Sequence, residues 1–160
     1  MKNKHPLKVL VPIDDSNVSQ NVVTSLCQRK WPNQVEFRIV TVVPYIANEP
    51  EVTRGTFPYP AERPYAMEET KTRSMLNYYG ETVINEVLAE LRANIRHAQI
   101  DGKVLVGGVV SSIVQEALEW ETDLIVIGSR QRGGLFRFMS GGTAEAVSKK
   151  VSCQVEVIRT

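Results

Sequence analysis

Five short segments rich in β-branched residues recur along the chain, and segments with helical periodicity separate them. The five apolar segments span residues 7–13, 35–43, 100–106, 124–127 and 154–159. The clearest helical stripe between them consists of Met75, Tyr79, Val83, Val87, Leu91 and Ile95. Nearly continuous apolarity, as in 124–127, is typical of strands buried on both faces. This alternation predicts an α/β fold, a doubly wound parallel sheet of five strands with helices on both faces.

Polar residues at the ends of these segments predict where two of the helices begin. Asp14, Asp15 and Ser16 directly follow the first strand, and each is a good N-cap for the helix behind it. Ser111 and Ser112 are expected to cap the helix after the third strand in the same way. Gly128 is expected to end the fourth strand, because it follows the apolar run directly.

Length and charge limit what the chain can be. With 160 residues it fits a single domain, 1–160, in which we expect 1–6 to be a flexible tail and 44–68 a long loop. The net charge of +1 gives no basic footprint for nucleic acid and no attraction to an anionic membrane. No apolar run is long enough to span a bilayer. A cytoplasmic location is expected.

Residues that usually carry chemistry are sparse. His5 and His97 are peripheral, and no cluster of His, Cys, Asp or Glu has the spacing of a metal site. Cys27 and Cys153 lie in apolar-periodic segments, which favours small buried hydrophobic residues over reactive thiols. A phosphate-binding P-loop is excluded, since Gly134 stands where its lysine would be. We therefore expect no catalytic residue, no metal and no enzymatic activity.

Ligands in doubly wound sheets bind at the carboxyl ends of the strands, where the strand order reverses. That rule selects residues 12–16, 42–45 and 128–143. The last of these ends in Gly141-Gly142-Thr143, where glycines and a helix start suit an anion, and Arg130 adds positive charge. A plain connecting loop with turning glycines and solubilising arginines explains the same residues.

Three segments resemble the universal stress protein family, in the right order and over essentially the whole chain. They are 9–16 (VLVPIDDS), 123–130 (DLIVIGSR) followed by Gly141, Glu145 and Val147, and 152–159 (SCQVEVIR). The resemblance implies a five-stranded sheet of order 3-2-1-4-5. It also implies a homodimer paired through the last strand, here Val155, Val157 and Ile158.

One branch of this family binds ATP through a motif that resembles Gly-x2-Gly-x9-Gly-Ser/Thr. Gly128 and Gly141 keep the first and third positions of that motif. Gln131 replaces the second glycine, Gly142 replaces the hydroxyl residue, and Thr143 offers a hydroxyl one position later. The phosphate half of the site is thus altered, and Gln131 either crowds the phosphates or donates an amide hydrogen bond to them.

The adenosine half of the motif is better preserved. Pro12, Ile13 and Asp14 match the family's first strand, with Asp14 accepting from the adenine amino group or a ribose hydroxyl, and Val42 matches the residue whose backbone pairs with adenine. We therefore expect a dimeric stress-response module that binds ATP, with ADP or AMP left open. The alternative is a dimeric interaction module of the same family that binds no ATP. The aromatics of 44–68 either cover the nucleotide or pack on the core.

Overall fold

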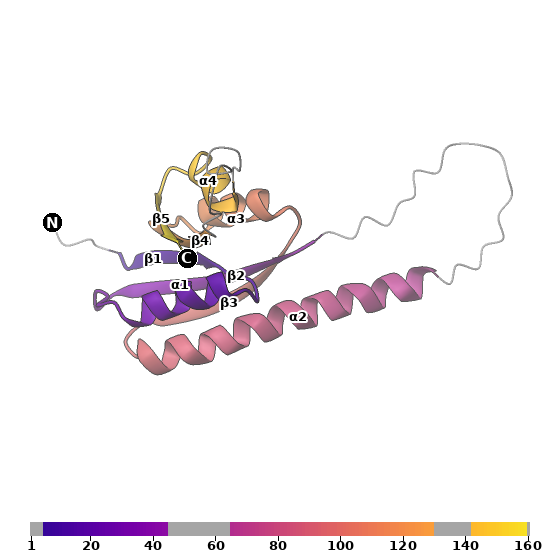
Figure 1. The fold of residues 1–160 in the computed structure, drawn as a ribbon, viewed down its shortest axis with the longest axis horizontal. Helices are drawn as coiled ribbons and strands as arrows, with labels where there is room; N and C mark the ends of the chain where they lie inside the picture. The colour runs from indigo at the N-terminus through magenta and orange to yellow at the C-terminus, as the bar shows by residue number, and fades with distance from the viewer. Residues whose placement is uncertain (1–4, 45–64, 130–141, 160) are drawn as a thin grey trace, which may run out of the picture.

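The elements of the fold follow the order expected from the sequence. The computed structural model describes residues 5–44, 65–129 and 142–159, and their side chains outside 65–70. Strands and helices alternate in the order β1 (Leu7–Pro12), α1 (Asn17–Cys27), β2 (Val35–Val43), α2 (Tyr65–Asn94), β3 (Gln99–Val106), α3 (Val109–Glu119), β4 (Leu124–Ser129), α4 (Thr143–Ser148) and β5 (Gln154–Arg159) (Figure 1). The expected β2 and β5 are confirmed to the residue.

The strands form one parallel sheet in the order β3-β2-β1-β4-β5, which confirms the expected topology. Six residue pairs join β1 to β2, from Leu7–Val35 to Pro12–Val40. Two pairs join β1 to β4, Val9–Leu124 and Leu10–Ile125. The chain winds outward in opposite directions from β1 and β4, so the carboxyl ends of these two strands define the crevice where such sheets bind ligands.

Two apolar cores fill the space between the sheet and its two helical layers. Helices α1 and α2 cover one face, and α3 and α4 cover the other (Figure 1). Side chains alternate along each strand, so Val9 and Val11 enter the α1/α2 core while Leu10 enters the α3/α4 core. Burial on both faces explains why β1 and β4 read as continuous apolar runs.

Helix α2 packs tightly on the sheet only in its second half. A Cβ at Gly102 of β3 would lie 2.2 Å from Cγ2 of Ile84, so this contact requires glycine. The N-terminal end of α2 extends past the sheet (Figure 1), and Met75 and Tyr78 there are exposed. The expected loop 44–68 is therefore too long at its end, because helix α2 already begins at Tyr65.

Two boundary predictions were wrong for local reasons. The N-cap of α3 is Gly108 and not Ser111 or Ser112, because Gly107, with φ of 141°, turns the chain early enough for the helix to start at Val109. The Ser111 hydroxyl instead donates to the Gly108 carbonyl at 3.0 Å. Strand β4 does not end at Gly128 but continues to Ser129, because β5 pairs with it there.

Candidate functional site

The turn from β1 into α1 is held by hydrogen bonds to one carboxylate oxygen. Asp14 Oδ1 accepts from the Ser16 N–H at 3.0 Å, from the Ser16 hydroxyl, and from the Ser19 hydroxyl at 2.7 Å. The Asp14 N–H in turn donates to Ser19 Oγ at 2.8 Å. Ser16 caps α1 by accepting from the Ser19 N–H, as its position in the sequence predicts. Asp14 is thus exposed but fixed in orientation.

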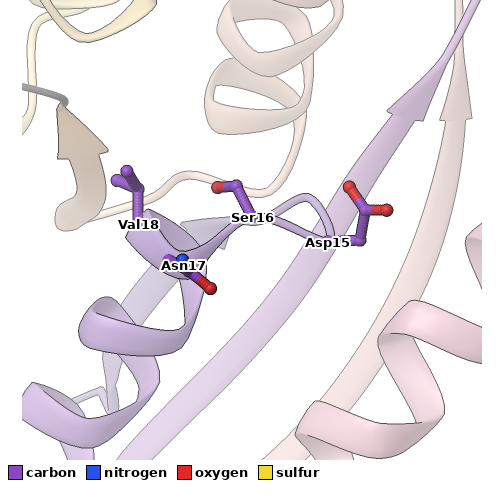
Figure 2. A pocket seen from close by; sticks show the side chains of 4 residues that line it. All are labelled: Asp15, Ser16, Asn17 and Val18. Atoms are coloured by element: carbon purple, nitrogen blue, oxygen red, sulfur yellow. The ribbon is translucent and has the colours of Figure 1, made fainter.

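A cavity of about 520 Å³ adjoins this turn and is lined by Asp15, Ser16, Asn17 and Val18 (Figure 2). The pKa of Tyr79 of α2 is raised above its usual value of 10.0, mainly because its hydroxyl interacts with the Asp15 carboxylate. Partial desolvation and the negative charges of Asp15 and Asp14 act in the same direction. The pocket rim therefore carries negative charge, suited to hydrogen-bond donors of a ligand.

The other first- and second-strand residues divide between the two faces of the sheet. The Ile13 side chain is buried in the α1/α2 core, and its N–H donates to the Val40 carbonyl at 2.8 Å. Val42 lies two residues beyond Val40 and packs half-buried on the α3/α4 core. Ile13 can therefore offer a ligand little besides its backbone, and Val42 pairs with Leu105 of β3 near the carboxyl end of β2.

Packing of α1 against β4 requires a glycine at position 128. A Cβ there would lie 2.4 Å from Cγ1 of Val18 and 3.1 Å from Cγ2 of Val22. Real Cβ atoms do not approach other atoms so closely, so any larger residue would displace the helix. The expected role of Gly128 near a ligand stays a prediction, and the structure gives the glycine a separate reason.

The phosphate side of the predicted site is described only at its end. Gly142 is the N-cap of α4, with φ of −69° and ψ of 170°, and a Cβ there would meet nothing within 4 Å. Thr143, the first residue of α4, is exposed. Arg130, Gln131 and Gly141 lie outside the described residues. The backbone at Gly142 therefore accepts any residue type without strain.

Sequence reasoning found Asp14 but missed the serine that holds it. Asp14, Ser16 and Ser19 form the spacing Asp-x-Ser-x-x-Ser across a strand end and a first helical turn. That spacing is typical of local side-chain hydrogen bonds at a helix start, and it could have indicated the arrangement. The Tyr79–Asp15 contact carried no such pattern, because the two residues lie far apart in the chain.

Other chemistry finds little support in the described part of the chain. In those residues, no three His, Cys, Asp or Glu side chains gather closely enough to hold a metal ion. Burial raises the pKa of the Cys27 thiol, with the charge of Glu90 adding to it, and burial also raises that of Cys153. Both cysteines are half-buried against the apolar cores, less than the full burial expected, and a raised pKa leaves less of the nucleophilic thiolate. None of the described helices has the length and apolarity to cross a membrane.

The fold and this crevice define a doubly wound α/β protein with a polar, anion-lined turn at its topological switch point. A model of the universal stress protein family matches residues 7–159. The chain therefore belongs to the universal stress protein family, as its three sequence segments indicate.

Individual relatives agree with this assignment. The stress response protein NhaX of Bacillus subtilis is 33% identical over 76 residues, which is 46% of this chain and 46% of NhaX, so the match spans about half the length of that relative. Universal stress protein UspA from Lactobacillus plantarum has a similar fold, with a TM-score of 0.68, 20% identity, and coverage of 98% of this chain and 100% of that one.

Two further structures of similar fold are described with nucleotides. An Arabidopsis thaliana universal stress protein family protein with AMP bound has a TM-score of 0.64 at 16% identity, covering 96% of this chain and 92% of that one. A universal stress protein in complex with cAMP has a TM-score of 0.62 at 17% identity, covering 98% of each chain. At such identities the similarity establishes the shared fold.

Proposed function

We propose that this chain is a cytoplasmic stress-response protein that binds an adenine nucleotide as a homodimer and has no catalytic activity of its own. Adenosine would lie at the carboxyl ends of β1 and β2, against Asp14 and Val42. The phosphates would lie toward Gly142 and Thr143 at the start of α4. The relatives with AMP and cAMP support an adenine nucleotide as the ligand class.

The observation that carries this proposal is the fixed carboxylate of Asp14 at the switch point. Asp14 stands at the end of β1, held by Ser16 and Ser19, next to the 520 Å³ cavity. An oriented acceptor of this kind suits the amino group of adenine or a ribose hydroxyl, because a charged acceptor makes a strong hydrogen bond. A cavity of this volume is in the range of small-ligand sites.

Isothermal titration calorimetry with AMP, ADP and ATP tests the proposal. We expect saturable binding of at least one nucleotide, and a loss of roughly tenfold or more in affinity for Asp14→Ala, which removes a charged hydrogen bond. Glu119→Ala is the matched control, since it removes an exposed carboxylate of α3 that accepts from Gln115 and does not line the cavity, and it should leave the affinity unchanged. Wild-type protein without heat or melting shift for all three nucleotides contradicts the proposal.

Gly142 offers a gain-of-function test for the phosphate position. Gly142→Ser restores the family's hydroxyl residue at a position where the added Cβ meets nothing within 4 Å. If phosphates lie there, the new hydroxyl should tighten ATP binding by roughly threefold or more, the effect of one hydrogen bond. Adenosine, which has no phosphate, serves as the control ligand and should bind both proteins equally. An unchanged ratio of ATP to adenosine affinity would place the phosphates elsewhere.

A second function is favoured by the way in which the turn uses Asp14. The three hydrogen bonds to Oδ1 are enough to explain why an aspartate stands in this turn. On the phosphate side, Gly142 stands where the ATP-binding motif has a hydroxyl residue. In that case the chain is a dimeric interaction module of the same family with no nucleotide. Asp14→Ala would then lower the melting temperature, while wild-type protein would ignore all added nucleotides.

A further inference from the structure

The buried hydroxyl of Ser19 makes two hydrogen bonds to Asp14. Ser19 Oγ accepts from the Asp14 N–H at 2.8 Å and donates to Asp14 Oδ1 at 2.7 Å. A hydroxyl carries one hydrogen, so donation to Oδ1 and acceptance from the N–H fix its direction as well. The Ser19 side chain therefore ties the backbone and the carboxylate of the same residue together. Only 8% of Ser19 is exposed, so water competes little for these bonds.

Together with Ser16, Ser19 also fixes the plane of the Asp14 carboxylate. Oδ1 already accepts from the Ser16 N–H, the Ser16 hydroxyl and the Ser19 hydroxyl. A carboxylate oxygen has two lone pairs, so these three donors saturate it. These bonds therefore set the plane of the carboxylate before a ligand arrives.

Ser19 also fixes the Asp14 carboxylate relative to the sheet. It belongs to the first turn of α1, and the same helix is held against β4 where Val18 and Val22 pack over Gly128. A helix pressed this closely onto a strand has one position. Asp14 is thus fixed relative to the end of β4, across the crevice between β1 and β4.

We propose that Ser19 is a positioning residue for nucleotide recognition, which holds the Asp14 carboxylate in one orientation at the ligand site. Because this role presupposes the nucleotide binding proposed above, it predicts a change in selectivity and not only in stability. A freely rotating carboxylate must be ordered on binding, which weakens recognition by roughly three- to tenfold.

The experiment compares wild type, Ser19→Ala and Ser19→Thr by calorimetry with AMP, inosine monophosphate and deoxy-AMP. AMP carries both the adenine amino group and the ribose 2′-hydroxyl. Inosine monophosphate lacks the amino group, and deoxy-AMP lacks the 2′-hydroxyl. Wild type should bind AMP more tightly than the analogue that lacks the group recognised by Asp14. Asp14→Ala should lose that difference in affinity, and the difference that it loses identifies the group. We expect Ser19→Ala to reduce the same discrimination by roughly three- to tenfold, and Ser19→Thr, which keeps the hydroxyl, to restore it.

The matched control is Ser25→Ala, the same substitution on the same helix, whose hydroxyl accepts from Arg29 and not from the turn. It should leave both affinity and discrimination unchanged. Should Ser19→Ala fail to fold, Ser19→Cys keeps the shape of the side chain with a slightly larger atom and a weaker hydrogen-bond donor, and it should give an intermediate loss of discrimination.

The failures of the two proposals can be told apart. Wild-type protein that binds none of the three nucleotides contradicts nucleotide binding itself. Wild-type protein that binds and discriminates, with a folded Ser19→Ala or Ser19→Cys that discriminates equally well, contradicts the role of Ser19 alone. A loss of melting temperature in Ser19→Ala with unchanged discrimination would make Ser19 a structural residue of the turn and would also overturn the inference.

Discussion

The two edges of the sheet are built from opposite kinds of side chain. Along edge strand β3, Asp101 and Lys103 are exposed and charged, and both join a network with Arg38 and Glu116. Along edge strand β5, the apolar residues Val155, Val157 and Ile158 are only half-buried, and the one acidic residue among them is Glu156. Both strands lack a neighbour on their outer side within the described residues.

This difference indicates which edge is suited to a second copy of the chain. Charges on an edge strand oppose pairing with another strand, whereas an apolar edge with unpaired backbone groups favours it. The β5 edge therefore supports the proposed homodimer, and the β3 edge discourages open-ended association. Arg29 hydrogen-bonds both oxygens of Glu156, with Nη1 and Oε2 2.6 Å apart. That ion pair neutralises the carboxylate that a partner strand would otherwise meet.

The largest effect is expected from removing the centre of the β3 network. The Glu116 side chain is 3% exposed and accepts from Arg38 at 3.0 Å and from Lys103 at 2.6 Å. Glu116→Ala leaves both cations without this partner, and we expect a loss of about 3 kcal/mol of unfolding free energy in urea titrations. This is the low end for a broken buried ion pair, because both cations still reach water.

Glu119→Ala is the matched control on the same helix. Glu119 is exposed, and its one hydrogen-bond donor among the described residues is Gln115, one turn earlier, so its loss should cost less than about 0.5 kcal/mol. Equal effects of the two variants would mean that the β3 network does not stabilise this edge. The comparison of the edges would then rest on solvent exposure alone.

The sequence predicted the strands far better than it predicted this network. Periodicity and β-branched runs reveal which residues enter a core, so β2 and β5 were confirmed to the residue. Arg38 of β2 and Glu116 of α3 lie 78 positions apart, so no local sequence pattern predicts that they will form an ion pair. Similarly, Asp14 was found by its place after a strand, whereas the need for glycine at Gly128 arises from α1 packing across the crevice.

A lysine on the apolar edge gives the next largest effect. In a symmetric antiparallel dimer, Val157→Lys places two like charges near the twofold axis, which costs several kcal/mol. We expect the dimer dissociation constant to rise about a hundredfold or more in analytical ultracentrifugation. Val106→Lys is the control on the β3 edge, where the valine is exposed, and it should leave the dimer dissociation constant unchanged. Dissociation caused by Val106→Lys and not by Val157→Lys would reverse the assignment of the edges.

The smallest effect concerns the ion pair behind β5, and its sign depends on pH. Hydrogen bonds from Arg29 lower the pKa of Glu156 below its ordinary 4.5, burial opposes this, and the charge of Arg29 adds to it. A carboxyl with a lowered pKa in the folded state contributes stability above its unfolded pKa, and that stability is lost as pH falls through the folded pKa. Glu156 is 38% exposed, so water screens the pair and its contribution should be about 1 kcal/mol or less.

Arg29→Met should therefore lower the unfolding free energy at about pH 7, and its difference from wild type should shrink as the pH falls below 4.5 and through the lowered pKa of Glu156. The dimer sharpens this test. At neutral pH the variant leaves a bare carboxylate at the β5 edge and should dimerise more weakly, whereas acid neutralises Glu156 and should restore association to the wild-type level. Lys149→Met, which breaks the exposed Glu145–Lys149 pair of α4, is the control and should show no such recovery. A variant that dimerises equally well at both pH values would show that Glu156 lies outside the interface, and only the apolar residues of β5 would then distinguish the two edges.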